Sequence, residues 1–156
     1  MKMDIDPPRR GIVLVVDDEP GVRALARRIL EGGGYGVIEA VNGVDALEVM
    51  ESSARVDFLI ADLDMPIMRG EEMTKLIRRL RPDLRVLYVT AHSERLFRER
   101  PELLEGEAFL DKPFTVRGLL EAVSLLKVGF IKEPPPAPQG SSLRRLWQTL
   151  LGSKPR

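Results

Sequence analysis

Two patterns of apolar and polar positions follow one another along the chain. Short apolar runs flanked by turn residues are typical of strands that are buried on both faces of a sheet. Such runs occupy positions 12–16, 35–41, 57–61, 86–89 and 108–110. After each run, apolar residues recur three or four positions apart, which places them on one face of a helix. The chain is therefore predicted to alternate strand and helix five times.

Three of the predicted helices have a well-defined apolar face. These faces comprise Val22, Leu25, Ala26, Ile29 and Leu30 in the first helix, Met73, Leu76, Ile77 and Leu80 in the third, and Val116, Leu119, Leu120, Val123 and Leu126 in the fifth. Each set keeps the spacing of a helix over about two turns or more. We expect these residues to pack against the sheet.

Local signals indicate where the helices begin and end. Pro20 suits the first helical position, and the three glycines at 32–34 end the first helix. Asn42 is expected to cap the second helix, and Ser93 is expected to cap the fourth. Because Pro101 falls inside the fourth helical pattern, that helix is expected to be short or broken.

The alternation predicts an α/β fold. Parallel strands need a right-handed crossover, usually a helix, so the sheet should be covered on both faces. The predicted architecture is a doubly wound, five-stranded parallel sheet of the flavodoxin-like kind, with strand order 2-1-3-4-5. In that order the first and third strands are neighbours, and ligands bind where the strand order reverses, at the carboxyl ends of the strands.

Polar side chains follow four of the five predicted strands. Asp17 and Asp18 end the first, Asp62 the third, Thr90 the fourth, and Lys112 follows the fifth. Carboxylates that converge in one crevice repel one another unless a hard cation lies between them, and oxygen ligands suit Mg²⁺ or Mn²⁺. A carboxylate, a metal, a hydroxyl and an ammonium together favour transfer of a phosphoryl group to Asp62 by in-line attack.

The composition excludes several classes of protein but points to no further functional groups at the site. The chain has 24 basic and 24 acidic residues among 156 and no formal net charge, so nothing points to nucleic acid as a partner. It has no cysteine, which excludes disulfides and thiolate metal sites. No stretch has the apolar length of a signal peptide core or a membrane span. The expected location is the cytoplasm.

The ordered motifs resemble those of the receiver domains of two-component response regulators, including stand-alone, chemotaxis-regulator-like ones. The matching residues are Asp17-Asp18, the segment from Asp62 through Met65-Pro66 to Gly70, Thr90-Ala91, and Lys112-Pro113-Phe114. The resemblance covers about residues 11–128, and four motifs in order are far more specific than any one of them. It implies a phosphorelay protein that catalyses only its own aspartyl phosphorylation and dephosphorylation and is otherwise not an enzyme.

The resemblance also implies a role for each acid at the site. Asp62 would be the phosphoacceptor, Asp18 a direct ligand of Mg²⁺, and Asp17 a ligand through water. The backbone carbonyl of Asp64 would complete the protein ligands. The side chain of Asp64 adds negative charge near an incoming anion, which bears on the rate of phosphorylation.

The remaining implied roles concern contacts and switching. Thr90 and Lys112 would contact the phosphoryl oxygens, and Thr90 and Phe109 would form the switch that follows phosphorylation. From its apolar context alone, Phe109 is more safely assigned to core packing. His92, the only histidine, is interpreted as a solvated loop residue beside the site.

Two alternative functions are weighed against this one. Asp62 and Asp64 form an Asp-x-Asp after an apolar strand, as in Mg²⁺-dependent phosphatases of the haloacid-dehalogenase type. In those enzymes the nucleophile comes early and the second acid pair late, whereas Asp17 and Asp18 precede Asp62 here. The other alternative is a receiver-like binding module that never takes phosphate, against which the complete set of site residues argues.

The domain organisation is predicted as an extension over 1–10, a receiver domain over 11–129, a proline-rich linker over 130–140 and a short amphipathic helix within 141–156. No DNA-binding or enzymatic output domain is expected in the residues that follow the receiver in this sequence, although a piece cut from a larger protein is an open alternative. The expected partners are therefore a histidine kinase or histidine phosphotransfer protein and a downstream protein. The terminal helix is expected to dock on protein, either this receiver, a second copy in a homodimer, or a partner; the alternative is a frayed tail that docks on nothing. Membrane attachment is not expected, since anchoring needs more apolar area.

Overall fold

The computed structural model describes residues 10–52, 54–99 and 106–128, in which strands and helices alternate. The strands are β1 (Ile12–Val16), β2 (Gly36–Ala40), β3 (Phe58–Asp62), β4 (Arg85–Thr90) and β5 (Glu107–Asp111). The helices are α1 (Pro20–Gly32), α2 (Gly43–Glu51), α3 (Gly70–Leu80), α4 (Ser93–Glu99) and α5 (Val116–Val128). The predicted succession of elements is confirmed.

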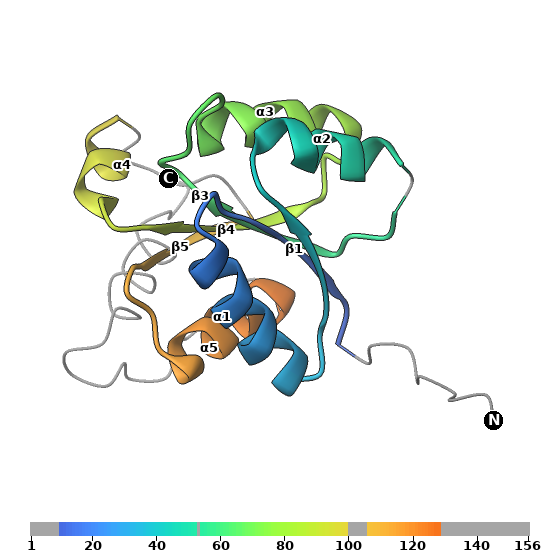
Figure 1. Ribbon diagram of the computed structural model, residues 1–156, viewed down its shortest axis with the longest axis vertical. Coiled ribbons are helices and arrows are strands. Elements are labelled where there is room, and N and C mark those ends of the chain that lie inside the picture. The colour runs from blue at the N-terminus through green and yellow to red at the C-terminus, as the bar shows by residue number, and fades with distance from the viewer. Residues whose placement is uncertain (1–9, 53, 100–105, 129–156) are drawn as a thin grey trace, which may run out of the picture.

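The five strands form one parallel sheet in the order β2-β1-β3-β4-β5, so the predicted fold class and strand order are confirmed. Helices α1 and α5 lie together on one face, and α2 and α3 lie together on the other (Figure 1). Helix α4 lies beside β5. This is the arrangement that right-handed crossovers produce when the chain winds first one way and then the other from the centre of the sheet.

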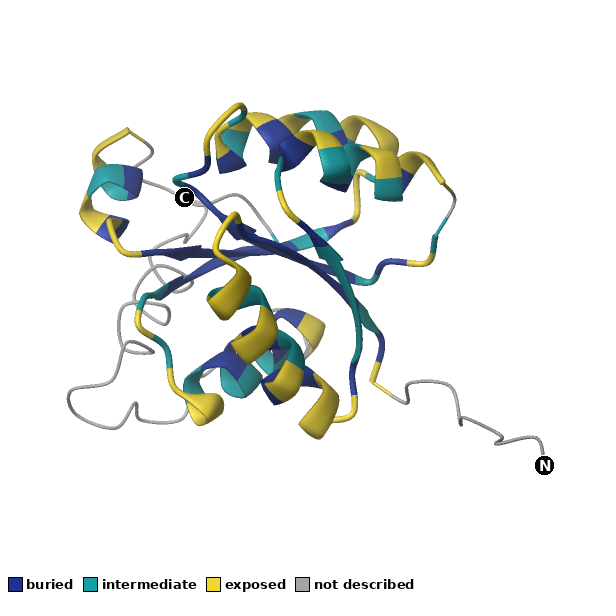
Figure 2. Cartoon of the chain, viewed as in Figure 1, coloured by how far each residue is buried: buried dark blue, intermediate teal, exposed yellow. Residues whose placement is uncertain are grey.

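Burial follows the position of each strand in the sheet. All five residues of the central strand β3 are buried, and β1 is buried except for its first residue. The edge strand β2 is only half-buried until its last residue. Figure 2 shows the buried strands running between two layers of helices whose outer sides are exposed. Two apolar clusters result, one under α1 and α5 and the other under α2, α3 and α4.

The register of the strands brings the polar residues to one edge of the sheet. Val16 of β1 pairs with Ala61 of β3, so Asp17 and Asp62 come next on neighbouring strands. Thr90, the last residue of β4, pairs with Asp111 of β5, and Lys112 follows directly. Because the strands are parallel, all four side chains belong to the carboxyl edge of the sheet.

Three residues assigned to the buried helical faces are exposed instead, and these assignments were wrong. The exposed fractions are 47% for Leu25, 49% for Leu80 and 59% for Val116. Leu80 and Val116 are the last and first residues of their helices. Leu25 lies at the margin of an α1 stripe whose buried residues are Ala26, Ile29 and Leu30. Helical spacing gives the direction of a face but not its width or length.

The expected helix ends are largely confirmed. The side chain of Asn42 accepts a hydrogen bond of 2.9 Å from the backbone N–H of Asp45 at the start of α2, and Pro20 is the first residue of α1. Ser93 is buried and is the first residue of α4. The sequence predicted it as the N-cap, which is the position just before the helix. Helix α4 has 7 residues and is short, as expected. Pro101 lies outside the described residues.

Most of the predicted extension, linker and terminal helix also lies outside the described residues, so those domain assignments stay predictions. In the parts of the chain that the structure describes, no helix has the length and apolar character that crossing a membrane requires.

Gly70 allows α3 to begin directly against the end of β3. Its backbone N–H donates a hydrogen bond of 3.2 Å to the carbonyl oxygen of Leu63. A Cβ atom at this position would lie 2.3 Å from the carbonyl oxygen of Asp62 and 3.0 Å from the Cα of Leu63. Backbone cannot give way as a flexible side chain can, so only glycine fits without moving the strand end.

We therefore expect Gly70→Ala to lower the free energy of unfolding by about 2 kcal/mol or more, because the added methyl forces backbone apart in a packed region. Gly21→Ala is the matched control, since a Cβ atom there, on the exposed start of α1, would meet nothing within 4 Å beyond its own stretch of helix. That variant should be as stable as the parent or up to about 1 kcal/mol more stable. Chemical denaturation measures both, and equal effects of the two substitutions would contradict this account.

Candidate functional site

The candidate site is built on a contact between one ammonium and two buried carboxylates. The Nζ of Lys112 lies 2.7 Å from Oδ2 of Asp17 and 3.5 Å from Oδ2 of Asp62. Asp17 and Asp62 are 3% and 4% exposed, and the Lys112 side chain is 13% exposed. The three residues come from the end of β1, from β3 and from the turn after β5, so the sheet register assembles them.

The backbone around the site holds the carboxylates in place. Oδ1 of Asp62 accepts a hydrogen bond of 3.2 Å from the N–H of Asp64, and Oδ1 of Asp17 accepts one of 2.9 Å from the N–H of Glu19. The guanidinium of Arg23, on α1, donates to the backbone carbonyl of Asp17 at 2.7 Å. Each acidic side chain is thus fixed by its own loop as well as by the lysine.

Burial raises the pKa of Asp62 to about 6. The positive charge of Lys112 acts in the opposite direction, while the negative charge of Asp17 adds to the rise. For Lys112, burial acts to lower the pKa, but the hydrogen bond to Asp17 and the charges of Asp17 and Asp62 outweigh it, so the pKa is raised. The lysine therefore stays protonated, whereas burial favours the neutral form of the Asp62 carboxyl.

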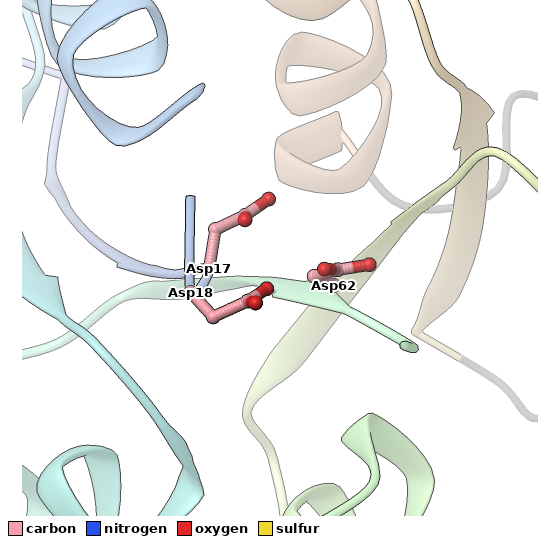
Figure 3. A group of neighbouring side chains, drawn as sticks. All are labelled: Asp17, Asp18 and Asp62. Atoms are coloured by element: carbon pink, nitrogen blue, oxygen red, sulfur yellow. The ribbon is translucent and has the colours of Figure 1, made fainter. Parts of the chain in front are cut away.

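Asp18 completes a cluster that suits a hard cation. Carboxylate oxygens of Asp17, Asp18 and Asp62 all lie within 4.8 Å of one another, and Asp18 is exposed to solvent (Figure 3). Oxygen ligands of an octahedral Mg²⁺ at about 2.1 Å from the ion are about 3–4 Å apart, so small side-chain movements would close this cluster on it. The donor set, with an exposed side for water ligands, fits Mg²⁺.

Thr90 is fully buried at the end of β4. Its Oγ1 accepts a hydrogen bond of 2.9 Å from the N–H of His92, and its carbonyl accepts one of 2.8 Å from the N–H of Lys112. The two strand ends that carry Thr90 and Lys112 are therefore tied together. His92 itself is exposed, as the sequence led us to expect.

Phe109 has no exposed surface, in agreement with its assignment to core packing. Its ring meets that of Phe97, on α4, edge to face with 4.6 Å between the centroids. The ring of Phe109 is thus directed inward and holds α4 against β5. A change of its rotamer would require Phe97 to move.

Sequence reasoning missed one charged residue at the site. Nη2 of Arg95, on α4, lies 2.6 Å from Oδ1 of Asp64, and these two side chains are 36% and 32% exposed. The carboxylate that was expected to repel an incoming anion is therefore paired with a cation. Arg95 lies on an ordinary charged helix turn, and no motif in the sequence marks it.

Comparisons with known proteins agree with this geometry. The family model described as "Response regulator receiver domain" matches residues 13–124. The sensor kinase CckA of Brucella abortus is 37% identical over 112 residues, which are 71% of this chain and 12% of that protein. Sporulation initiation phosphotransferase F of Bacillus subtilis is 30% identical over 111 residues, 71% of this chain and 89% of that protein. The chain thus spans only about an eighth of the first relative but most of the second.

One solved structure is similar to this chain in both fold and sequence. The response regulator TrrA of Thermotoga maritima, in complex with Mg²⁺-BeF, has a TM-score of 0.65 and 33% sequence identity to this chain. The match covers 74% of this chain and 98% of that one.

The raised pKa of Asp62 leads to a prediction about stability and pH in the presence of a chelator. The folded state favours the neutral carboxyl, so its contribution to stability is full below about pH 4 and is lost as the pH rises through about 6. Asp62→Asn removes this titration. We expect the free energy of unfolding of the parent to fall by about 3 kcal/mol relative to Asp62→Asn across that range, measured by denaturation at each pH. Parallel pH profiles of the two proteins would contradict the assignment.

The cluster leads to a second prediction, about metal affinity. If Asp18 is a direct ligand, Asp18→Ala should weaken Mg²⁺ binding by at least about tenfold, which corresponds to about 1.4 kcal/mol. Glu19→Ala is the control, because this neighbouring exposed acid is outside the cluster and lies 3.8 Å from Lys112. Its removal should change the affinity only slightly, since exposed charges are screened. Isothermal titration calorimetry measures both, and similar losses would remove Asp18 from the site.

Proposed function

This chain belongs to the response regulator receiver domain family, and on that premise we propose that it takes a phosphoryl group onto Asp62 in a two-component phosphorelay. The observation that carries the proposal is the convergence of the Asp17, Asp18 and Asp62 carboxylates with the Lys112 ammonium at the carboxyl edge of the sheet. Receiver domains in general are phosphoacceptors rather than enzymes that turn over a separate substrate.

In the proposed reaction, a carboxylate oxygen of Asp62 attacks the phosphorus of a phosphohistidine, and a phosphorus–oxygen bond forms as the phosphorus–nitrogen bond breaks. The electron pair of the broken bond stays on the imidazole nitrogen, which takes a proton from solvent. The protein positions the groups and neutralises charge, which is most of what phosphoryl transfer requires. Hydrolysis of the resulting acyl phosphate returns Asp62 to its carboxylate.

The residues have distinct tasks in this scheme. Asp17, Asp18, Asp62 and the backbone carbonyl of Asp64 would hold the metal ion, of which Mg²⁺ is the first choice and Mn²⁺ the second. When bound, the ion supplies positive charge for the transferring phosphoryl oxygens. Three carboxylates against one ammonium leave two negative charges uncompensated, which a divalent cation matches.

Lys112 and Thr90 act on the phosphoryl group itself. The ammonium of Lys112, which lies 2.7 Å from Asp17 and 3.5 Å from Asp62, would contact a phosphoryl oxygen on Asp62. The hydroxyl of Thr90 accepts from His92 and can still donate its own hydrogen to the phosphoryl group. In this proposal Thr90 and Phe109 are the switch, and the contact of Phe109 with Phe97 would carry the change to α4.

The partners follow from the family. Receiver domains interact with histidine kinases or histidine phosphotransfer proteins, and we propose one of these as the phosphodonor and a second protein as the recipient of the signal. The cytoplasmic location and a homodimer stay predictions. The family match argues against a phosphatase of the haloacid-dehalogenase type, and phosphorylation itself distinguishes this proposal from a binding module that takes no phosphate.

We expect the purified chain to gain the mass of one phosphoryl group when it is incubated with Mg²⁺ and acetyl phosphate or a phosphorylated histidine kinase. Asp62→Asn should not gain this mass, because its amide is not a nucleophile for phosphorus. Asp83→Asn, at an exposed position before β4, is the matched control and should behave like the parent. Intact-protein mass spectrometry decides the matter, and an equal gain in Asp62→Asn would remove Asp62 from its role.

A further inference from the structure

The ion pair between Arg95 and Asp64 joins α4 to the segment that follows the acceptor. The distance of 2.6 Å between Nη2 of Arg95 and Oδ1 of Asp64 is that of a strong charge-assisted hydrogen bond. On its other side, Nε of Arg95 lies 3.8 Å from Oε1 of Glu99 on the same helix. The guanidinium is thus held mainly by one partner, and that partner comes from the acceptor loop.

Asp64 is connected to the acceptor as well as to Arg95. Its backbone N–H donates to Oδ1 of Asp62, so its backbone is tied to the reacting carboxylate, while Arg95 holds its side chain. Arg95 and Lys112 also line the same open cavity of about 610 Å³ at this edge of the sheet. A phosphoryl group on Asp62 next to Lys112 would therefore lie at the margin of a space that Arg95 already faces.

We propose that Arg95 is a positioning residue for the phosphoryl group, held by Asp64 while Asp62 is free and transferred to a phosphoryl oxygen when Asp62 is phosphorylated. The inference rests on the proposed function, and the exchange makes and breaks no covalent bond. Phosphorylation replaces one carboxylate charge by a group that approaches two negative charges and offers three acceptor oxygens. That group competes with Asp64 for the guanidinium, whose planar fork binds phosphate well.

Asp64 then has a function other than simple repulsion of the donor. In the free state it holds the guanidinium of Arg95 and neutralises its charge. Removal of the Asp64 carboxylate should strengthen anion binding at the site, mainly because it releases Arg95. The two substitutions Asp64→Asn and Arg95→Gln should consequently act in opposite directions, and the first should depend on the presence of Arg95.

The test uses beryllofluoride, a tetrahedral mimic of the phosphoryl group, with Mg²⁺ and the full chain. We expect Arg95→Gln to weaken beryllofluoride binding about tenfold, or about 1.4 kcal/mol, and Arg95→Lys to recover part of the loss because it keeps the charge but not the fork. Asp64→Asn should strengthen binding several-fold. Arg98→Gln is the matched control, since Arg98 is exposed on the same helix and lines the same cavity, and it should bind as the parent does.

A double variant separates contact from general electrostatics. At about 1 M salt, where the Debye length is about 3 Å, repulsion through solvent is screened. At this salt concentration, Asp64→Asn should still strengthen beryllofluoride binding when Arg95 is present. When it is combined with Arg95→Gln in the double variant, it should have little effect. Equal effects in both backgrounds, or equal losses in Arg95→Gln and Arg98→Gln, would overturn the inference while the proposed function stands. A parent chain that binds neither beryllofluoride nor phosphate would overturn the proposed function and this inference with it.

Discussion

Two carboxylates buried side by side, with one ammonium between them, are the constraint on which the site depends. Asp17 and Asp62 have almost no contact with water, so their mutual repulsion is not screened, and Lys112 at 2.7 and 3.5 Å is the nearest compensation. Burial raises the pKa of Asp62, the negative charge of Asp17 adds to the rise, and the positive charge of Lys112 only partly opposes it. The site is under electrostatic stress that a divalent cation would relieve.

The fold tolerates this stress because the sheet beneath it is so regular. Five parallel strands with apolar residues on both faces fix the ends of β1 and β3 next to each other, and the acids cannot move apart without disturbing the strand pairing. Gly70 adds a second constraint, since α3 begins against the backbone of Asp62 itself. The stability of the core thus maintains a polar arrangement that would not persist alone, as is common at functional sites.

Helix α4 connects the site to the outer surface in two ways. On its inner side, Phe97 packs against the fully buried Phe109. Elsewhere on the helix, Arg95 pairs with Asp64 in the loop after Asp62. One contact is apolar and the other ionic, so α4 is held both by packing at the end of the sheet and by an ion pair beside the site.

The sequence alone determined the fold class, the strand order and the four strand ends that carry Asp17, Asp62, Thr90 and Lys112, because apolar periodicity and parallel crossovers leave few arrangements. It did not determine where a helical face ends, so Leu25, Leu80 and Val116 were assigned to the interior although they are exposed. Only the tertiary structure paired Arg95 with Asp64, since residues 31 positions apart in sequence meet through the placement of α4 and no local pattern records a surface ion pair. Local chemistry fixes which residues end each strand, whereas distances between elements depend on how the whole sheet and its helices pack.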